Sequence, residues 1–151
     1  MQIIDFYSSK DKEHWLSQLR LCDWRACEYL CYLIDSATFY DVLGKSSQLF
    51  LLCKDDKLLS FCALTERDQV ETDLTPWVGF VYTYPFARGK RLMGTLFKKV
   101  RSVAAARGFD TLYLTTDHVG LYEKYGFDFM CTMKEQNGED TRIYKINVNK
   151  E

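Results

Sequence analysis

The chain has 151 residues and a formal net charge of −1, with 47% hydrophobic and 27% charged residues, as in an ordinary globular protein. Its eight glycines and two prolines exclude collagen-like and low-complexity chains, and its longest charge-free stretch, residues 74–87, is too short to span a membrane. A chain of this length can bury a sizeable core, so we expect residues 1–151 to form a single domain.

The N-terminus carries Asp5 within its short apolar run and has no basic region before it, unlike a secretory signal peptide. We therefore expect a cytoplasmic protein, whose thiols stay reduced. The six cysteines could instead form disulfides or bind a metal, but Cys22, Cys27 and Cys31 lack the Cys-x-x-Cys spacing of zinc modules. We predict reduced cysteines and no metal site.

Hydrophobic periodicity predicts an alternation of helices and strands along the whole chain. Asp23 is a suitable N-cap for the second helix, whose apolar stripe includes Tyr29. Gly108 stands where a glycine commonly ends a helix. The expected elements, in order, are a strand (2–7), helices (12–19 and 24–37), a hairpin (48–54 and 57–65), a strand (76–84), a long helix (92–107), a strand (111–115), a short helix (121–125) and two strands (127–134 and 142–148).

This order describes a mixed α/β domain whose central unit is a strand, a basic loop, a helix and a second strand, a crossover expected to be right-handed. The charges are unevenly distributed around that unit. Residues 74–109 contain seven basic residues and no acidic one, whereas the rest of the chain has 13 basic and 21 acidic residues. Such asymmetry indicates an anionic partner, although a solvated helix face without a partner explains it equally well.

The loop of residues 88–91 (RGKR) enters the long helix. The free N–H groups and the dipole of a helix N-terminus favour an anion, above all phosphate. Gly89 allows a close approach, and the three basic side chains add full charges. The spacing of Gly89 and Gly94 does not fit Gly-x-Gly-x-x-Gly, and no Gly-Lys-Ser/Thr occurs, so a dehydrogenase or an NTPase is disfavoured. The loop predicts a phosphate-bearing ligand without naming it.

Two linked motifs, YPFARGKRLMGTL (residues 84–96) and GLYEKYGF (residues 120–127), resemble those of the GNAT superfamily of acyl-CoA N-acyltransferases. That family has a phosphate loop of the form Arg/Gln-x-x-Gly-x-Gly/Ala and, later, a Tyr shortly before Gly-Phe. The segment DLTPWVGFVY (residues 73–82) is also similar to the strand before the loop in many members. Arg91 and Met93 depart from the pattern, because they stand where it has Gly and Gly or Ala.

The resemblance implies a GNAT-like α/β fold and transfer of an acetyl group from acetyl-CoA to a primary amine by direct attack, without a metal. The strand before the loop would hydrogen-bond the donor through backbone groups of Val81 and Thr83, and one N–H would face the thioester oxygen. The implied cofactor-binding residues are Val81, Tyr82, Thr83, Arg88, Gly89, Lys90, Arg91, Leu92, Met93, Gly94 and Thr115.

Tyr122 matches the family's tyrosine that protonates the leaving thiolate, although it could instead simply pack in the core. The amine also needs a base, directly or through water. Glu66 is the first candidate, and Asp68 and Asp73 are the others. His118 could relay a proton or simply lie in its loop.

Trp24, Arg25 and Trp77 are the candidates for the acceptor pocket, although a buried Trp is more often part of the core. The acceptor could be an amino sugar, a polyamine, an antibiotic, an amino acid, or a peptide or protein amine, and the acidic frame favours a cationic one. A homodimer is common among such proteins.

Two other hypotheses remain. The irregular loop at Arg91 and Met93 favours a non-catalytic GNAT-like module that binds an acyl-CoA or a protein partner as a sensor or scaffold. A small nucleic-acid binder that uses the basic helix is disfavoured, because the basic stretch lacks interleaved aromatic residues and the net charge is slightly negative.

Overall fold

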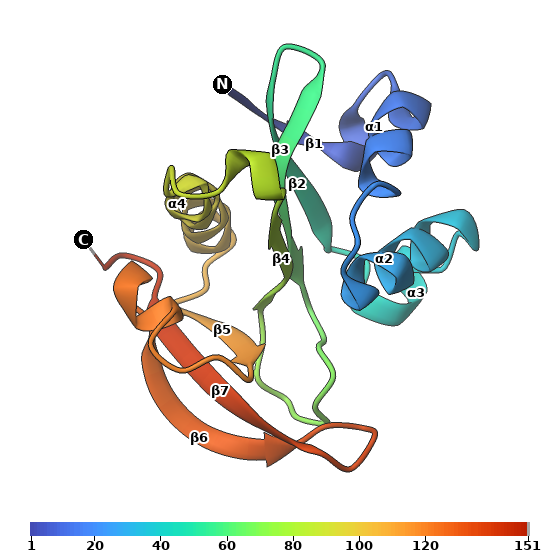
Figure 1. Cartoon of the computed structure of the whole chain (residues 1–151). Coiled ribbons are helices and arrows are strands. Elements are labelled where there is room, and N and C mark those ends of the chain that lie inside the picture. Colours follow the sequence, from blue (N-terminus) through green and yellow to red (C-terminus); the bar gives the residue numbers. More distant parts are fainter. Residues whose placement is uncertain (151) are drawn as a thin grey trace.

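The computed structural model describes residues 1–150. Seven strands form one twisted sheet, and four α-helices pack on its two faces (Figure 1). The elements are β1 (Gln2–Asp5), α1 (Lys12–Leu19), α2 (Arg25–Asp35), α3 (Phe39–Leu43), β2 (Gln48–Lys54), β3 (Lys57–Thr65), β4 (Trp77–Thr83), α4 (Leu92–Ala106), β5 (Thr111–Thr116), β6 (Asp128–Lys134) and β7 (Asp140–Asn147), with 3₁₀ turns at Phe6–Ser8, Pro85–Ala87 and Tyr122–Tyr125.

The strand order is β1-β2-β3-β4-β5-β7-β6, and every neighbouring pair is antiparallel except β4 and β5. The parallel pair is the one that α4 connects, as the predicted strand–loop–helix–strand unit requires. The expected mixed α/β fold is therefore confirmed.

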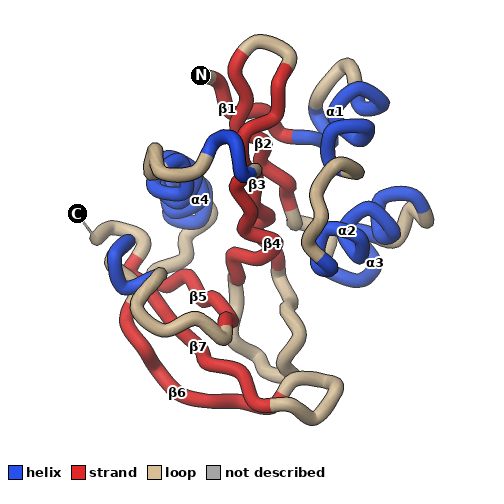
Figure 2. Tube along the Cα trace, viewed as in Figure 1, coloured by secondary structure: helices blue, strands red, loops and turns tan. Residues whose placement is uncertain are grey.

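The sheet separates two apolar layers. Helices α1, α2 and α3 cover one face, and α4 covers the other (Figures 1 and 2). Strand residues alternate between the two sides, so that Leu51 packs toward the layer of α1–α3 and Leu52 toward the layer of α4. Five of the 15 residues of α4 are buried, which explains the apolar stripe of that helix.

Most predicted elements are confirmed to within two residues at each end, and the hairpin β2–β3 has its predicted bounds. The short helix α3 was not predicted. The prediction that Asp23 caps α2 is wrong, because the N-cap is Trp24 and the Asp23 carboxylate accepts a hydrogen bond from the Tyr82 hydroxyl at 3.0 Å. The inward placement of Tyr29 is also wrong, because its ring is 46% exposed.

The prediction that all cysteines are reduced is wrong for one pair. Cys22 and Cys27 form a disulfide across the turn between α1 and α2, where the chain reversal brings their Cα atoms to 6.2 Å. Cys31, Cys53, Cys62 and Cys131 are free thiols.

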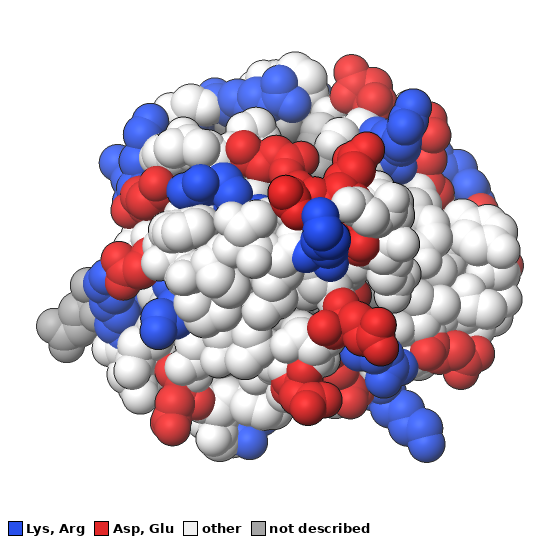
Figure 3. Space-filling model, turned by 90° about the horizontal axis from the view of Figure 1, so that it is seen from below, with Lys and Arg blue, Asp and Glu red and all other residues white. Residues whose placement is uncertain are grey.

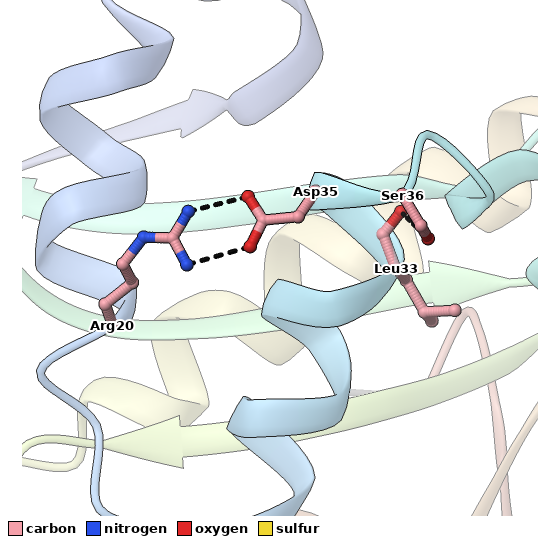
Figure 4. A network of polar contacts seen from close by, with 4 residues as sticks. All are labelled: Arg20, Leu33, Asp35 and Ser36. Carbon is pink, nitrogen blue, oxygen red and sulfur yellow. Dashed lines mark hydrogen bonds and ion pairs between the residues drawn. The ribbon is translucent and has the colours of Figure 1, made fainter.

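A second link joins the same two helices. The Arg20 guanidinium at the end of α1 donates two hydrogen bonds, of 2.8 and 2.6 Å, to the carboxylate of Asp35 at the end of α2 (Figure 4). This fork geometry is directional, although both side chains are half exposed. The pair lowers the pKa of Asp35 by hydrogen bonding to its ionised form. Together with the disulfide, it fixes α2 relative to α1.

Seen from below, the molecule carries acidic and basic side chains interspersed around a broad uncharged area (Figure 3). This face therefore presents no continuous basic surface. Within residues 1–150, no helix is long and apolar enough to cross a membrane.

Replacing Leu96 on α4 tests the packing of that helix on the sheet. The Leu96 side chain is fully buried, so Leu96→Ala should leave a cavity and lower the free energy of unfolding by about 2–5 kcal/mol. Lys99→Ala, at an exposed position of the same helix, should change it by less than about 0.5 kcal/mol. Urea denaturation measures both, and equal effects would contradict the assigned face.

Candidate active site

The site begins where β4 and β5 separate. The two strands are paired only between Trp77 and Tyr113, next to a hydrogen bond of 3.0 Å from the Tyr113 N–H to the Pro76 carbonyl. Beyond this point they diverge, as Figure 1 shows. A cleft of about 1390 Å³ opens there, larger than the roughly 300–1,000 Å³ that one drug-sized ligand occupies. The cleft therefore has room for two molecules at once.

Strand β4 forms one wall of the cleft and is irregular at its centre. Two residues, Phe80 and Val81, lie opposite the single residue Cys62 of β3, which makes a β-bulge. Phe80 has a φ of +51°, a conformation that costs energy for a residue with a Cβ. Because β4 pairs with β5 at one residue only, the backbone groups on this edge beyond Trp77 can bind an extended ligand. Val81, Tyr82 and Thr83, expected on the donor side, line the cleft.

The basic loop follows β4 and leads into α4. The Arg88 side chain folds back, and its Nε donates to the Thr83 carbonyl at 2.9 Å. Gly89 has a φ of +84°, and a Cβ there would meet no atom within 4 Å, so the backbone faces open space. Arg91 is the N-cap of α4 without a side-chain cap, which leaves the first N–H groups of this helix free for an anion.

Arg91 adopts the left-handed conformation, with a φ of +56°. The GNAT pattern has Gly at this position, and glycine is the residue that takes this conformation at no steric cost. This chain has a guanidinium at that position instead. Arg88, Gly89, Arg91, Leu92 and Met93 line the cleft. Lys90 and Gly94 do not, and Gly94 instead approaches the ring of Tyr125.

Tyr122 lies at the floor of the cleft, in the turn after β5. Its ring packs against Phe97 and Phe127, with centroid separations of 6.1 Å in both cases, and the side chain is only 7% exposed. Burial raises the pKa of Tyr122 to about 12. The fully buried Cys62 thiol also has a raised pKa, for the same reason.

The structure places the three candidate bases in different surroundings. Glu66 does not line the cleft. It lies in a separate depression beside Gly44, where its carboxylate accepts a hydrogen bond from the Ser46 N–H at 2.8 Å, and this bond lowers the pKa of Glu66. Asp73 is exposed and also lies outside the cleft. Asp68 lines the cleft.

The Asp68 carboxylate sits against the backbone of β4, next to the bulge. A Cβ on Gly79 would lie 3.3 Å from Asp68 Oδ2, so this approach depends on the missing side chain. Asp68 Oδ1 accepts hydrogen bonds from the Thr115 hydroxyl at 3.0 Å and from the Gln69 N–H at 2.6 Å. Burial nevertheless raises the pKa of Asp68 to about 6. Thr115, predicted to bind the cofactor, thus lines the cleft and contacts an acid.

Of the residues predicted for the acceptor, Trp24 and Arg25 line the cleft. The prediction for Trp77 is wrong. Its side chain is fully buried and its Nε1 donates to the Leu74 carbonyl at 2.7 Å, so it supports the sheet where β4 meets β5. His118 lines the cleft at its rim.

Several residues of the cleft were not predicted, because elements remote in sequence bring them there. The turn between β6 and β7 packs on the loop between β3 and β4, where the Gln136 N–H donates to the Gln69 carbonyl at 3.0 Å. This contact closes one end of the cleft. The unpredicted residues of the lining include Tyr29, Thr65, Phe80 and Glu135.

Comparison with known proteins agrees with this geometry. The model of the acetyltransferase (GNAT) family matches residues 10–127, most of the chain. The chain therefore belongs to the GNAT acetyltransferase family. No curated protein sequence gives a significant match.

Solved structures share the fold at low sequence identity. An acetyltransferase from Streptococcus agalactiae is 21% identical, with a TM-score of 0.69 and 97% of each chain covered. The aminoglycoside 6'-N-acetyltransferase from Enterococcus faecium is 13% identical, with a TM-score of 0.70 and coverage of 100% of this chain and 99% of that one. A GNAT family acetyltransferase from Elizabethkingia anophelis with acetyl-CoA bound is 18% identical, with a TM-score of 0.64 and 97% of each chain covered.

The ionisation of Asp68 can be tested directly. Its carboxyl ¹³C resonance should titrate with a midpoint of about 6 in the folded protein. Thr115→Val should move the midpoint up by about 1 pH unit, because the ionised carboxylate loses a hydrogen bond. Thr115→Ser keeps a hydroxyl and should leave the midpoint near 6. A midpoint of about 4 in the unaltered protein would show that Asp68 is solvated.

Proposed function

We propose that this chain is an acetyl-CoA-dependent N-acetyltransferase that acts, as a single domain, on a small-molecule or peptide amine. The amine attacks the acetyl group directly while both substrates are bound. One observation carries the proposal: a single cleft joins the free N-terminus of α4, the open edge of β4, a buried phenol at Tyr122 and a half-buried carboxylate at Asp68.

The residues that line the cleft fit acetyl-CoA as the acetyl donor. The uncapped N-terminus of α4, with Arg88 and Arg91 beside it, would hold the diphosphate of coenzyme A. The open edge of β4 would hydrogen-bond the amide groups of the pantetheine arm through Val81 and Thr83. Acetyl-CoA, when bound, supplies an acetyl group already activated as a thioester. A backbone N–H of β4 near the bulge would stabilise the charge that develops on the acetyl oxygen.

Tyr122 would act as the general acid. Its hydroxyl is protonated at neutral pH, as that of an ordinary phenol is, and burial raises its pKa further, to about 12. It can therefore supply the proton that the departing sulfur takes up. A phenol in a buried wall also excludes water, which would otherwise compete with the amine.

Asp68 would act as the general base, rather than Glu66, our first candidate from the sequence. Asp68 faces the cleft beside the bulge, whereas Glu66 is held by Ser46 in a separate depression. A pKa of about 6 makes Asp68 a stronger base than an ordinary carboxylate, and it is still ionised at neutral pH. It would accept a proton from the incoming ammonium, directly or through water.

Donor binding is the first test. Acetyl-CoA at 100-fold its Kd should raise the free energy of unfolding by about 2.7 kcal/mol, because it binds only the folded chain. Desulfo-CoA should stabilise the protein similarly, because it retains the phosphates. Pantetheine is the matched control and should have little effect, because it lacks the diphosphate. Thermal denaturation measures all three, and no stabilisation by either coenzyme at millimolar concentration would falsify the proposal.

The variant Tyr122→Phe tests the general-acid role of Tyr122, because it retains the ring and removes the hydroxyl. Turnover should fall by about 10²–10⁴-fold, while the Kd for desulfo-CoA stays within a factor of two to three. Tyr125→Phe is the matched control, because Tyr125 lies in the same turn and lines the same cleft. Release of free thiol from acetyl-CoA measures turnover. Normal turnover of the Tyr122→Phe variant would remove the acid role and leave donor binding untouched.

A further inference from the structure

The cleft has one aromatic wall, where the start of α2 meets β4. Trp24 and Tyr29 line it and remain 40% and 46% exposed, with Phe80 and Tyr82 of β4 beside them. Trp24 stacks on Tyr82, with ring centroids 5.9 Å apart and planes at 11°, and Tyr29 lies 6.3 Å from Phe80. Large apolar surfaces that stay exposed within a cleft mark a binding site.

The backbone holds this wall in place. The bulge of β4 gives Phe80 its positive φ, which is a strained conformation retained at a position that lines the cleft. The Tyr82 hydroxyl donates to Asp23, and the disulfide between Cys22 and Cys27 encloses the segment that carries Trp24. The wall is therefore preorganised for a flat ligand.

A second wall of the cleft is acidic. Asp68, Asp117 and Glu135 line the cleft there, and the pKa of Glu135 is raised by burial and by Asp117. Arg67 lies nearby, but its guanidinium donates to the carbonyls of Asp41 and Val42, so its direction is fixed away from the carboxylates. This wall attracts a cation.

A buried polar group of the cleft lining lacks a partner. Thr65 is 2% exposed and lines the cleft, and within residues 1–150 its Oγ1 makes no hydrogen bond. A buried hydroxyl without a partner costs free energy unless a ligand or water bonds to it. Thr65 is three residues before Asp68, so this unsatisfied group lies on the chain segment that supplies the base.

From these two walls we infer that the acceptor is an arylalkylamine: a primary ammonium group joined by a short linker to an aromatic ring. The ring would stack on Trp24 and Tyr29, and the ammonium would reach Asp68, with Thr65 as a further hydrogen-bond partner. This inference rests on the proposed function and names its substrate class. A polyamine would leave the aromatic wall unused, and an aminoglycoside would need carboxylates on several sides.

Binding calorimetry tests the inference on the full chain, both free and saturated with the unreactive donor analogue desulfo-CoA. We expect 2-phenylethylamine to bind at least about tenfold more tightly than n-butylamine, which has the same ammonium without the ring. Spermidine and kanamycin should bind more weakly than 2-phenylethylamine. L-Phenylalanine should also bind more weakly, because its carboxylate would meet the acidic wall.

Variants of Trp24 test where the aromatic ring of the ligand binds. Trp24→Ala should weaken 2-phenylethylamine binding about tenfold and leave n-butylamine binding unchanged, whereas Trp24→Phe should restore most of the difference. Phe129→Ala is the matched control, because Phe129 is 46% exposed, close to the 40% of Trp24, and lies outside the cleft. Unchanged melting temperatures and desulfo-CoA affinity establish that the variants fold.

The inference is wrong if n-butylamine, spermidine, kanamycin or L-phenylalanine binds as tightly as 2-phenylethylamine, or if Trp24→Ala has no effect on the preference. Failure of the proposed function has a different signature. In that case neither acetyl-CoA nor desulfo-CoA binds, whatever the amine. Acetylation of spermidine with release of free thiol would preserve the proposed function and overturn the arylalkylamine.

Discussion

The separation of β4 from β5 is the constraint on which the site depends. A parallel pair that stayed hydrogen-bonded along its length would satisfy its own backbone groups and leave no space between the strands. Here the pairing stops after Trp77, whose buried side chain supports the junction. The polar backbone beyond it is left for a ligand, and the cleft forms in the middle of the sheet rather than on its surface.

The bulge at Phe80 and Val81 lies in the middle of β4, the strand that lines the cleft. After the bulge the strand continues to Thr83 and the basic loop, and the aromatic rings of Phe80 and Tyr82 meet α2. In the proposed function the donor and the acceptor thus share one strand, so small changes in the bulge should alter the binding of both.

Burial gives the two titratable groups of the cleft their different tasks. Desolvation disfavours the ionised form of both Tyr122 and Asp68, which raises both pKa values. Because a phenol has an ordinary pKa near 10 and a carboxyl one near 4, Tyr122 remains protonated and Asp68 remains ionised at neutral pH despite the same shift. The proposed acid and base thus differ by their chemical type, and burial makes the carboxylate the stronger base.

The mixed α/β fold, the hairpin and the loop that enters α4 could be predicted from the sequence, because these follow from local periodicity, turn residues and spacing. The sequence pattern located this loop but did not reveal the left-handed backbone at Arg91. The different surroundings of Glu66 and Asp68, which are two residues apart, follow only from the folded chain. The tertiary structure also moved Trp77 into the core and Tyr29 into the cleft, because burial depends on which distant strands and helices meet.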